Sequence, residues 1–255
     1  FYYKGNYIYA LSYHDTPGNE SNALEQQLIF YKKYFTNVSL SDLDLFFENK
    51  KWHKDKPGLI LSYDDGLRSN FDIAAPLLEK YGFTGWFFVP TDFLDSPVEK
   101  QITFMNNHSI SSRETYKDGR VAMSWSEVLQ LDKKHVIGCH TKTHHRMVPS
   151  SSKNKVHQEI TVSKRILKER LGYDTNIFCW VGGEEKSYSA IGALAIRKAN
   201  YKYSFMTNCN PITISTNPLQ LQRNNVETSW PINVVKFALI GVMDLLYIPK
   251  RKRVN

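Results

Sequence analysis

Two adjacent carboxylates, Asp64 and Asp65, are the strongest chemical signal in this sequence. They follow the run Leu-Ile-Leu-Ser-Tyr at residues 59–63, which is typical of a buried strand, and they precede Gly66, which suits a sharp turn. Neighbouring residues of an extended chain point to opposite sides, so one carboxylate can bind a metal ion while the other faces the substrate. Asp-Asp-Gly is also typical of an ordinary turn, and that alternative stays open until other residues are considered.

A second cluster of candidate ligands, His140, His144 and His145, follows a predicted strand at residues 136–139. The carboxyl ends of parallel strands meet at one face of a barrel or sheet, so Asp65 is expected near these imidazoles. Asp65, His140 and His144 form a ligand set for Zn²⁺ or a similar divalent ion and leave positions for water and substrate. His145 is an alternative ligand to His144, and a surface pair of histidines is the alternative to a metal site.

Alternating apolar runs and amphipathic segments predict the elements that position these residues. Helical spacing and end signals predict helices over residues 22–35, 71–81, 124–133, 153–171 and 187–200, and capping boxes at Ser41–Asp44 and Ser124–Glu127. Apolar and aromatic runs predict strands over residues 7–13, 59–63, 84–89, 136–139, 176–181 and 203–206. Strands that alternate with helices in this way indicate a parallel sheet with helices packed outside it.

One internal segment and the last part of the chain give weaker signals. Residues 91–121 are polar and longer than a usual connection, which indicates either a long loop that acts as a lid over the site or an insertion. Short strands at residues 212–214 and 219–223 and a final helix over residues 231–246 complete the prediction. No domain boundary is evident, so residues 1–255 are expected to form a single domain.

The sequence Ser-Tyr-Asp-Asp-Gly at residues 62–66, followed by His-Thr-Lys-Thr-His at residues 140–144, resembles the NodB-homology polysaccharide deacetylases, carbohydrate esterase family four. The resemblance covers residues 7–227 and is nearest to the branch that acts on surface and biofilm polysaccharides. It implies an α/β fold, a distorted (β/α) barrel of about seven parallel strands. It also implies a metal-dependent hydrolase that removes an N-acetyl or other acyl group from a sugar.

The same resemblance implies a role for each residue of the two motifs. Asp65, His140 and His144 would bind the metal, with Zn²⁺ as the expected ion. Asp64 would be the general base, and a metal-bound water would be the nucleophile.

Two motifs of that family have no clear match here. Residues 178–185 lack the proline and tyrosine of its third motif, and no Leu-x-His follows His157, so the general acid is unassigned. His14 is a candidate because its Tyr-His pair resembles the start of the biofilm-polysaccharide branch, and the alternative is a capped turn residue. Arg223 either pairs with Asp64 and tunes it, or binds an acidic sugar, or forms an ordinary surface salt bridge.

Trp180 and Glu184 are candidate substrate-binding residues beside this site. An indole stacks on sugar rings, and a carboxylate binds hydroxyl groups or an amine product. The alternatives are a core tryptophan and a carboxylate at the solvated start of a helix.

Composition bears on the partners and the location. The formal charge of +8 suits an acidic or phosphate-linked saccharide, although part of it lies in the basic run at residues 250–253. Nucleic acid is not an expected partner, because no recognised motif for it is present, and no apolar run is long enough for a transmembrane helix. Three cysteines without CxxC spacing favour a cytoplasmic location, with peripheral membrane association as an option, and residues 1–5 lack a signal-peptide pattern.

Two functions follow from these observations. The first is a metal-dependent deacetylase that acts on a sugar of a surface polysaccharide, such as an O-antigen, or on its precursor. The second is a non-catalytic sugar-binding or assembly protein on the same scaffold, because a fold does not determine a function. The presence of every ligand-type residue favours the enzyme, while the oligomeric state is not predicted.

Overall fold

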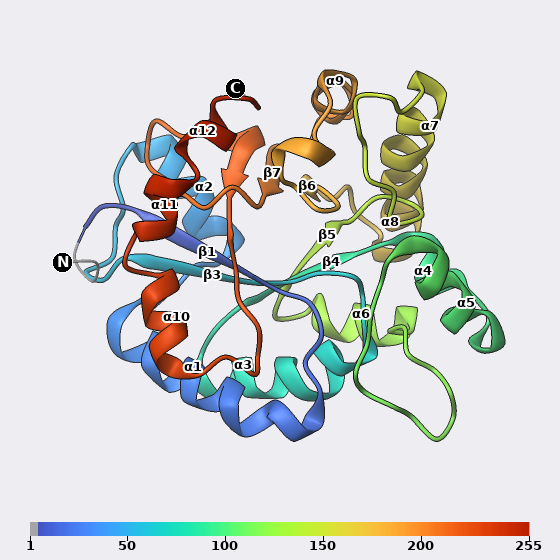
Figure 1. The fold of residues 1–255 in the computed structure, drawn as a ribbon, viewed down its shortest axis with the longest axis horizontal. Coiled ribbons are helices and arrows are strands. Elements are labelled where there is room, and N and C mark those ends of the chain that lie inside the picture. The colour runs from blue at the N-terminus through green and yellow to red at the C-terminus, as the bar shows by residue number, and fades with distance from the viewer. Residues whose placement is uncertain (1–4, 255) are drawn as a thin grey trace.

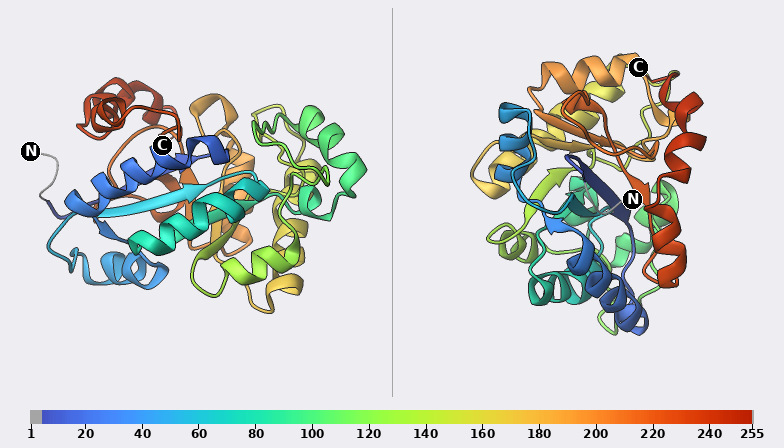
Figure 2. Two further views of the ribbon diagram at one scale, coloured as in Figure 1. Left: turned by 90° about the horizontal axis from the view of Figure 1, so that it is seen from below. Right: turned by 90° about the vertical axis from the view of Figure 1, so that its left-hand side faces the viewer.

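Parallel strands curl into a nearly closed barrel with helices around it in the computed structural model of the chain, which describes residues 5–254 (Figure 1). Residues 1–4, on which most of the expectation about the start of the chain rests, lie outside this range. The views in Figure 2 show strands in the middle of the molecule and helices on several sides of them.

Strands, α-helices and shorter helical turns alternate along the chain. The strands are β1 (Ile8–Tyr13), β2 (Thr36–Asn37), β3 (Gly58–Tyr63), β4 (Gly85–Val89), β5 (Val136–Cys139), β6 (Ile177–Cys179), β7 (Tyr203–Met206), β8 (Leu221–Gln222) and β9 (Asn224–Asn225). The α-helices are α1 (Ser21–Tyr34), α2 (Leu40–Asn49), α3 (Ala75–Tyr81), α4 (Thr91–Asp95), α5 (Val98–His108), α6 (Trp125–Leu131), α7 (Lys153–His157), α8 (Ser163–Leu171), α9 (Ala190–Lys198), α10 (Ile232–Ala238), α11 (Val242–Leu246) and α12 (Ile248–Arg251). Short 3-10 helices are η1 (Gly18–Glu20), η4 (Glu185–Ser187) and η5 (Pro218–Gln220), and π-helical turns are η2 (Asn70–Ala74) and η3 (Gln158–Val162).

The strand order is β8-β7-β6-β5-β4-β3-β1-β9, with β2 paired to β3 outside this path. Strand β8 pairs with β7, and strand β9 pairs with β1, all in parallel. Only Arg223 separates β8 from β9, so the two short strands together occupy one position and bring the two ends of the sheet together. The expected (β/α) barrel of about seven parallel strands is therefore confirmed, with one strand position broken in two.

Side chains that alternate along the strands fill the barrel with an apolar layer. This interior cluster contains Ile8, Ala10, Ile60, Trp86, Phe88, Ile177, Tyr203, Phe205 and Leu221. The same alternation continues to Ser12, Ser62 and Asp64 at the carboxyl end of the barrel, and all three are buried. Polar groups therefore lie above an apolar layer at the end of the barrel where parallel strands finish.

Helix α2 closes the other end of the barrel. Val38, Phe46 and Trp52, from α2 and its flanks, belong to the interior cluster, and the Trp86 indole donates to the Val38 carbonyl at 3.0 Å. The predicted capping box at Ser41–Asp44 is wrong, because the box is formed by Ser39 and Asp42. Both pairs have the Ser-x-x-Asp spacing, so the spacing alone did not distinguish them. The box at Ser124 and Glu127 is confirmed.

Several predicted elements differ from the observed ones. The segment at 91–121 is not one long loop, because it contains α4 and α5. The single helix predicted over 231–246 is interrupted at Gly241, whose φ of 80° is left-handed and ends the helical run. The strand predicted at 212–214 is reduced to one antiparallel bridge between Ile212 and Ile8. Within residues 5–254, no helix has the length and apolar character needed to cross a bilayer.

The close packing inside the barrel predicts a cost for adding one methyl group to Gly138. A Cβ there would lie 2.5 Å from ring atoms of Phe88, so Gly138→Ala should lower the free energy of unfolding by about 1–3 kcal/mol. Urea denaturation measures this loss. In a Phe88→Leu background the clash is removed, so the same substitution should cost less, and an equal cost in both backgrounds would contradict the packing argument.

Candidate active site

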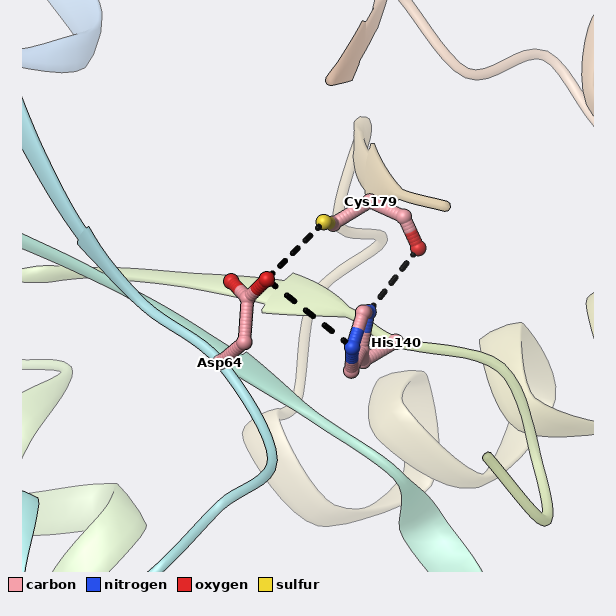
Figure 3. Close-up of side chains that lie close together, drawn as sticks. All are labelled: Asp64, His140 and Cys179. Carbon is pink, nitrogen blue, oxygen red and sulfur yellow. Dashed lines mark hydrogen bonds and ion pairs between the residues drawn. The ribbon is translucent and has the colours of Figure 1, made fainter. Parts of the chain in front are cut away.

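Four of the predicted site residues, together with Cys179, which the sequence did not single out, come together at the carboxyl ends of four strands. Asp64 and Asp65 follow β3, His140 follows β5, Cys179 ends β6, and Arg223 lies between β8 and β9. Figure 3 shows Asp64, His140 and Cys179 pointing toward one another. All five side chains are buried, so their contacts decide their chemistry.

The backbone at Asp65 separates the two neighbouring carboxylates. Asp65 has a φ of 73° and Gly66 a φ of 67°, so the chain turns sharply where the strand ends. A Cβ at Gly66 would lie 2.9 Å from a methyl carbon of Leu94, which explains why glycine occupies this position. As a result, Asp64 points toward Arg223, whereas Asp65 points toward the histidines.

Asp65, His140 and His144 form a tight group of possible metal ligands. The Oδ1 atom of Asp65 lies 3.0 Å from His144 Nε2 and 3.5 Å from His140 Nε2. Atoms that each lie about 2.0–2.2 Å from a common tetrahedral ion are separated by roughly 3–3.5 Å, so these distances fit a shared cation. His145 is not part of this group, because its Nε2 lies 3.2 Å from the Ser151 hydroxyl.

Backbone carbonyls orient both imidazoles from behind. His140 Nδ1 lies 3.0 Å from the Cys179 carbonyl oxygen, and His144 Nδ1 lies 2.6 Å from the His108 carbonyl oxygen. A carbonyl can only accept, so each Nδ1 carries the proton and each neutral ring directs the lone pair of Nε2 toward Asp65. Asp65 Oδ1 is itself buried and accepts no hydrogen bond within residues 5–254.

When both rings are neutral, Asp65 Oδ1 and the two Nε2 atoms are three converging acceptors, and they repel one another unless a cation lies between them. The donor set of one carboxylate and two imidazoles suits Zn²⁺ and similar divalent ions. The residues present therefore fit a divalent metal, and they leave coordination positions for water and substrate.

The pKa shifts of Asp65 and His144 also favour a positive charge at this site. Burial alone would raise the pKa of the Asp65 carboxyl, but His144 and His140 hold it well below its usual range. Burial would lower the pKa of His144, yet the Asp65 carboxylate raises it. The Asp65 carboxylate thus favours a positive charge beside it, which either a proton on His144 or a bound cation supplies.

Asp64 forms a buried ion pair with Arg223. The two guanidinium Nη atoms of Arg223 donate to the two Asp64 oxygens at 2.7 and 2.8 Å. The Arg223 Nη1 atom also donates to the Ser62 hydroxyl at 2.8 Å, and Ser12 donates to Asp64 Oδ2 at 3.3 Å. Arg223 is fully buried, so its ion pair with Asp64 is not an ordinary surface salt bridge. The pair also orients the Asp64 carboxylate, which lies beside His140.

The surroundings of Asp64 favour its ionised form. Burial would raise the pKa of its carboxyl, but the charges of Arg223 and His140 lower it below the usual value. Burial raises the pKa of the neighbouring Cys179 thiol well above its usual value, so Cys179 is a neutral partner in the cluster.

The remaining predicted residues lie at different depths. His14 is half-buried at the end of β1, and it contributes to lowering the pKa of both Asp64 and Asp65. Glu184 is partly exposed and lies 3.4 Å from Arg146. Trp180 is only 1% exposed, and its indole nitrogen donates to Ser204, so the indole has no open face for a sugar ring.

Glu159 supports residues 140–145, which we call the histidine loop. No pattern in the sequence indicated this role. Glu159 is fully buried on η3 and accepts hydrogen bonds from the Lys142 and Thr143 backbone amides at 2.9 and 2.8 Å. Thr141 and His144 on this loop have φ values of 67° and 57°, a conformation that is costly for residues other than glycine. A carboxylate inside a long amphipathic helix looks solvated in a sequence, and only the packing of that helix shows its role.

Comparisons with known proteins agree with the geometry. Residues 51–204, more than half of the chain, match the model of the polysaccharide deacetylase family. The structure of the Streptococcus pyogenes deacetylase PplD in complex with acetate is similar over 91% of this chain and 98% of that one, with a TM-score of 0.72 and 17% identity.

Two further structures have comparable likeness. A de-N-acetylase from Aggregatibacter actinomycetemcomitans matches over 91% of this chain and 99% of its own, with a TM-score of 0.72 and 17% identity. IcaB from Ammonifex degensii matches over 92% of this chain and 97% of its own, with a TM-score of 0.71 and 17% identity. At such identities the likeness shows the fold. Comparison with curated protein sequences gave no match.

Removing the charge of Arg223 should strongly destabilise the protein. Arg223→Met leaves the Asp64 carboxylate buried without its cation, which should lower the free energy of unfolding by about 3–5 kcal/mol. Chemical denaturation measures the loss. The double variant Arg223→Met with Asp64→Asn should lose less than the sum of the single changes, and strict additivity would show that the pair is not coupled.

Glu159→Gln should loosen the histidine loop. The neutral amide binds the two backbone N–H groups and the Lys155 ammonium more weakly, so the free energy of unfolding should fall by about 1.5–3 kcal/mol. Hydrogen exchange at the Lys142 and Thr143 amides should become faster. Glu169→Gln on α8, whose side chain is exposed, is the matched control and should change neither quantity. Unchanged exchange in Glu159→Gln would contradict the role of Glu159.

Proposed function

The chain belongs to the polysaccharide deacetylase family and is a deacetylase, and from this premise we propose that it hydrolyses the N-acetyl or another acyl group of a sugar in a surface polysaccharide or its precursor. We further propose that residues 1–255 act as one catalytic domain. The observation that carries the proposal is the convergence of Asp65, His140 and His144 beside an ionised Asp64.

Asp65, His140 and His144 would hold the divalent ion, and Zn²⁺ suits their donor set. When bound, such an ion supplies a Lewis acid that lowers the pKa of water and polarises an acyl carbonyl. The protein contributes ligands whose orientation is set by the carbonyls of Cys179 and His108 before any ion arrives.

Asp64 is proposed as the general base. Its Oδ2 lies 4.0 Å from His140 Nε2, so the carboxylate borders the metal ligands without being held by them. The Arg223 guanidinium keeps this carboxylate ionised and fixes its direction, so that it can take a proton from an attacking water. Arg223 thus acts through Asp64, as a positioning residue.

His14 is proposed as the proton donor to the leaving amine. It lies at the end of β1, its side chain is only half-buried, and its charge affects both aspartates. Histidine is the side chain that most often transfers protons in active sites, which suits a group that gives a proton to a departing nitrogen.

The substrate is proposed to be a saccharide with acidic or phosphate groups, which the charge of +8 would attract. Glu184 is retained as a candidate for binding hydroxyl groups or the amine product, because its side chain is partly exposed. Trp180 is not retained, because its ring lies in the core. The cytoplasmic location stays a prediction.

Metal content and acetate release test the proposal together. Elemental analysis should find about one divalent ion per chain after incubation with Zn²⁺. His144→Ala should lose the ion and the activity, whereas the matched control His145→Ala should keep both, since His145 faces Ser151. Asp64→Asn should keep the ion and release acetate from N-acetylhexosamine oligosaccharides about 10²–10⁴ times more slowly.

Each outcome distinguishes the alternatives. A wild-type protein that takes up no ion from a neutral Zn²⁺ solution would refute the metal site. A protein that binds the ion and the oligosaccharide but releases no acetate would be a sugar-binding protein on a deacetylase scaffold.

A further inference from the structure

Exposed apolar side chains are concentrated on the last three helices. We call residues 231–254, which contain α10, α11 and α12, the C-terminal ridge, and Figure 1 shows these helices along one side of the barrel. Its exposed large hydrophobic residues are Val234, Phe237, Val242, Leu245, Leu246 and Ile248. Leu245 and Leu246, at 68% and 64%, are the most exposed of this type within residues 5–254.

The C-terminal ridge is also strongly basic. Its charged residues are Lys236, Lys250, Arg251, Lys252 and Arg253 against the single acid Asp244, a net charge of +4. Asp244 turns inward, where it accepts a hydrogen bond from the Tyr9 hydroxyl at 2.9 Å, and burial raises the pKa of its carboxyl. Arg251 also turns inward, onto backbone carbonyls, and Arg253 forms an ion pair with Glu185 at 2.8 Å. The outer surface of the ridge therefore combines apolar side chains with the cations of Lys236, Lys250 and Lys252.

The C-terminal ridge is fastened to the barrel. The Asn224 side chain, on β9, donates to the Ala238 carbonyl at 2.8 Å, and Arg251 donates to the Asn208 carbonyl at 3.0 Å. Val235 of α10 and Leu239, which follows the end of α10, are fully buried. Because these inner contacts hold the helices in place, the exposed leucines cannot be buried by a simple rotation of the helices.

A cavity lies between the C-terminal ridge and the barrel, whose side of the lining includes Thr207, Asn224 and Asn225. It has a volume of about 280 Å³, and its lining includes Val234 and Phe237 of α10, Met243 of α11 and Tyr247. Val234 and Phe237 are also exposed, so the cavity borders the outer apolar surface.

We propose that the C-terminal ridge binds the surface of a lipid bilayer that contains anionic lipids. Apolar side chains that enter the headgroup region, with cations beside anionic headgroups, are the two contributions that hold a peripheral protein on such a surface. The cavity offers further apolar surface to an acyl chain. A second copy of the chain is a poorer occupant, because a symmetric contact would bring Lys236, Lys250 and Lys252 of one copy against the same three lysines of the other.

Vesicle sedimentation tests this inference independently of catalysis. Wild-type protein should sediment with vesicles of equal parts phosphatidylglycerol and phosphatidylcholine, more weakly at high salt, and poorly with phosphatidylcholine alone. The double variant Leu245→Ser with Leu246→Ser should bind at least about tenfold more weakly. Leu194→Ser, on α9 and 52% exposed, is the matched control and should bind as wild type does.

The basic residues are tested separately. Lys250→Gln and Lys252→Gln should each weaken binding to the anionic vesicles about fivefold. Acetate release from a soluble oligosaccharide and the far-UV circular dichroism spectrum should not change in these variants, which shows that they are folded.

Three results would overturn the inference. The first is wild-type protein that does not sediment with the anionic vesicles at low salt. The second is binding that the Leu245→Ser, Leu246→Ser variant retains in full. The third is a concentration-dependent dimer in sedimentation velocity that this variant abolishes, because it would assign the surface to a second copy of the chain.

Discussion

The ion pair between Arg223 and Asp64 links the closure of the barrel to its chemistry. Arg223 lies where the backbone passes from pairing with β7 to pairing with β1, and its side chain reaches Asp64 at the end of β3. Both groups are withdrawn from water, so each needs the other to offset the cost of burial. The last strand position therefore does more than close the sheet, because it also keeps the neighbouring carboxylate ionised and oriented.

The two adjacent aspartates acquire different roles from their surroundings. Asp64 faces a guanidinium, whereas Asp65 faces the Nε2 atoms of two imidazoles. Identical side chains thus become a candidate base and a candidate metal ligand because the positive φ at Asp65 turns them apart. Pairs of carboxylates in many active sites are divided by their environments in this way.

The histidine loop is held by elements far apart in the sequence. Glu159 on η3 binds its backbone amides, the His108 carbonyl at the end of α5 orients His144, and the Asp92 amide on α4 donates to the Lys142 carbonyl at 2.9 Å. The segment at 91–121 therefore supports the site as well as lying near it. These contacts hold two residues in left-handed conformations and place the imidazoles before a metal binds.

Much of this site was evident in the sequence. The periodicity of apolar residues predicted the alternating strands and helices, and the paired aspartates and histidines at strand ends predicted the residues that converge. These signals are local, because a side chain's type and its position in a strand or helix depend on neighbouring residues.

Tertiary structure alone decided the rest. The sequence left three options for Arg223, and only the structure shows that it is buried against Asp64. Nothing near Glu159 in the sequence indicates that it supports a loop 16 residues away. Only the structure shows that Trp180 is a core residue. Helix α9 packs directly on its indole ring, so closely that a Cβ at Gly192 of this helix would lie 2.8 Å from the ring. Partners of this kind are chosen by the closing of the barrel and the packing of helices, which bring distant residues together in ways that no local pattern records.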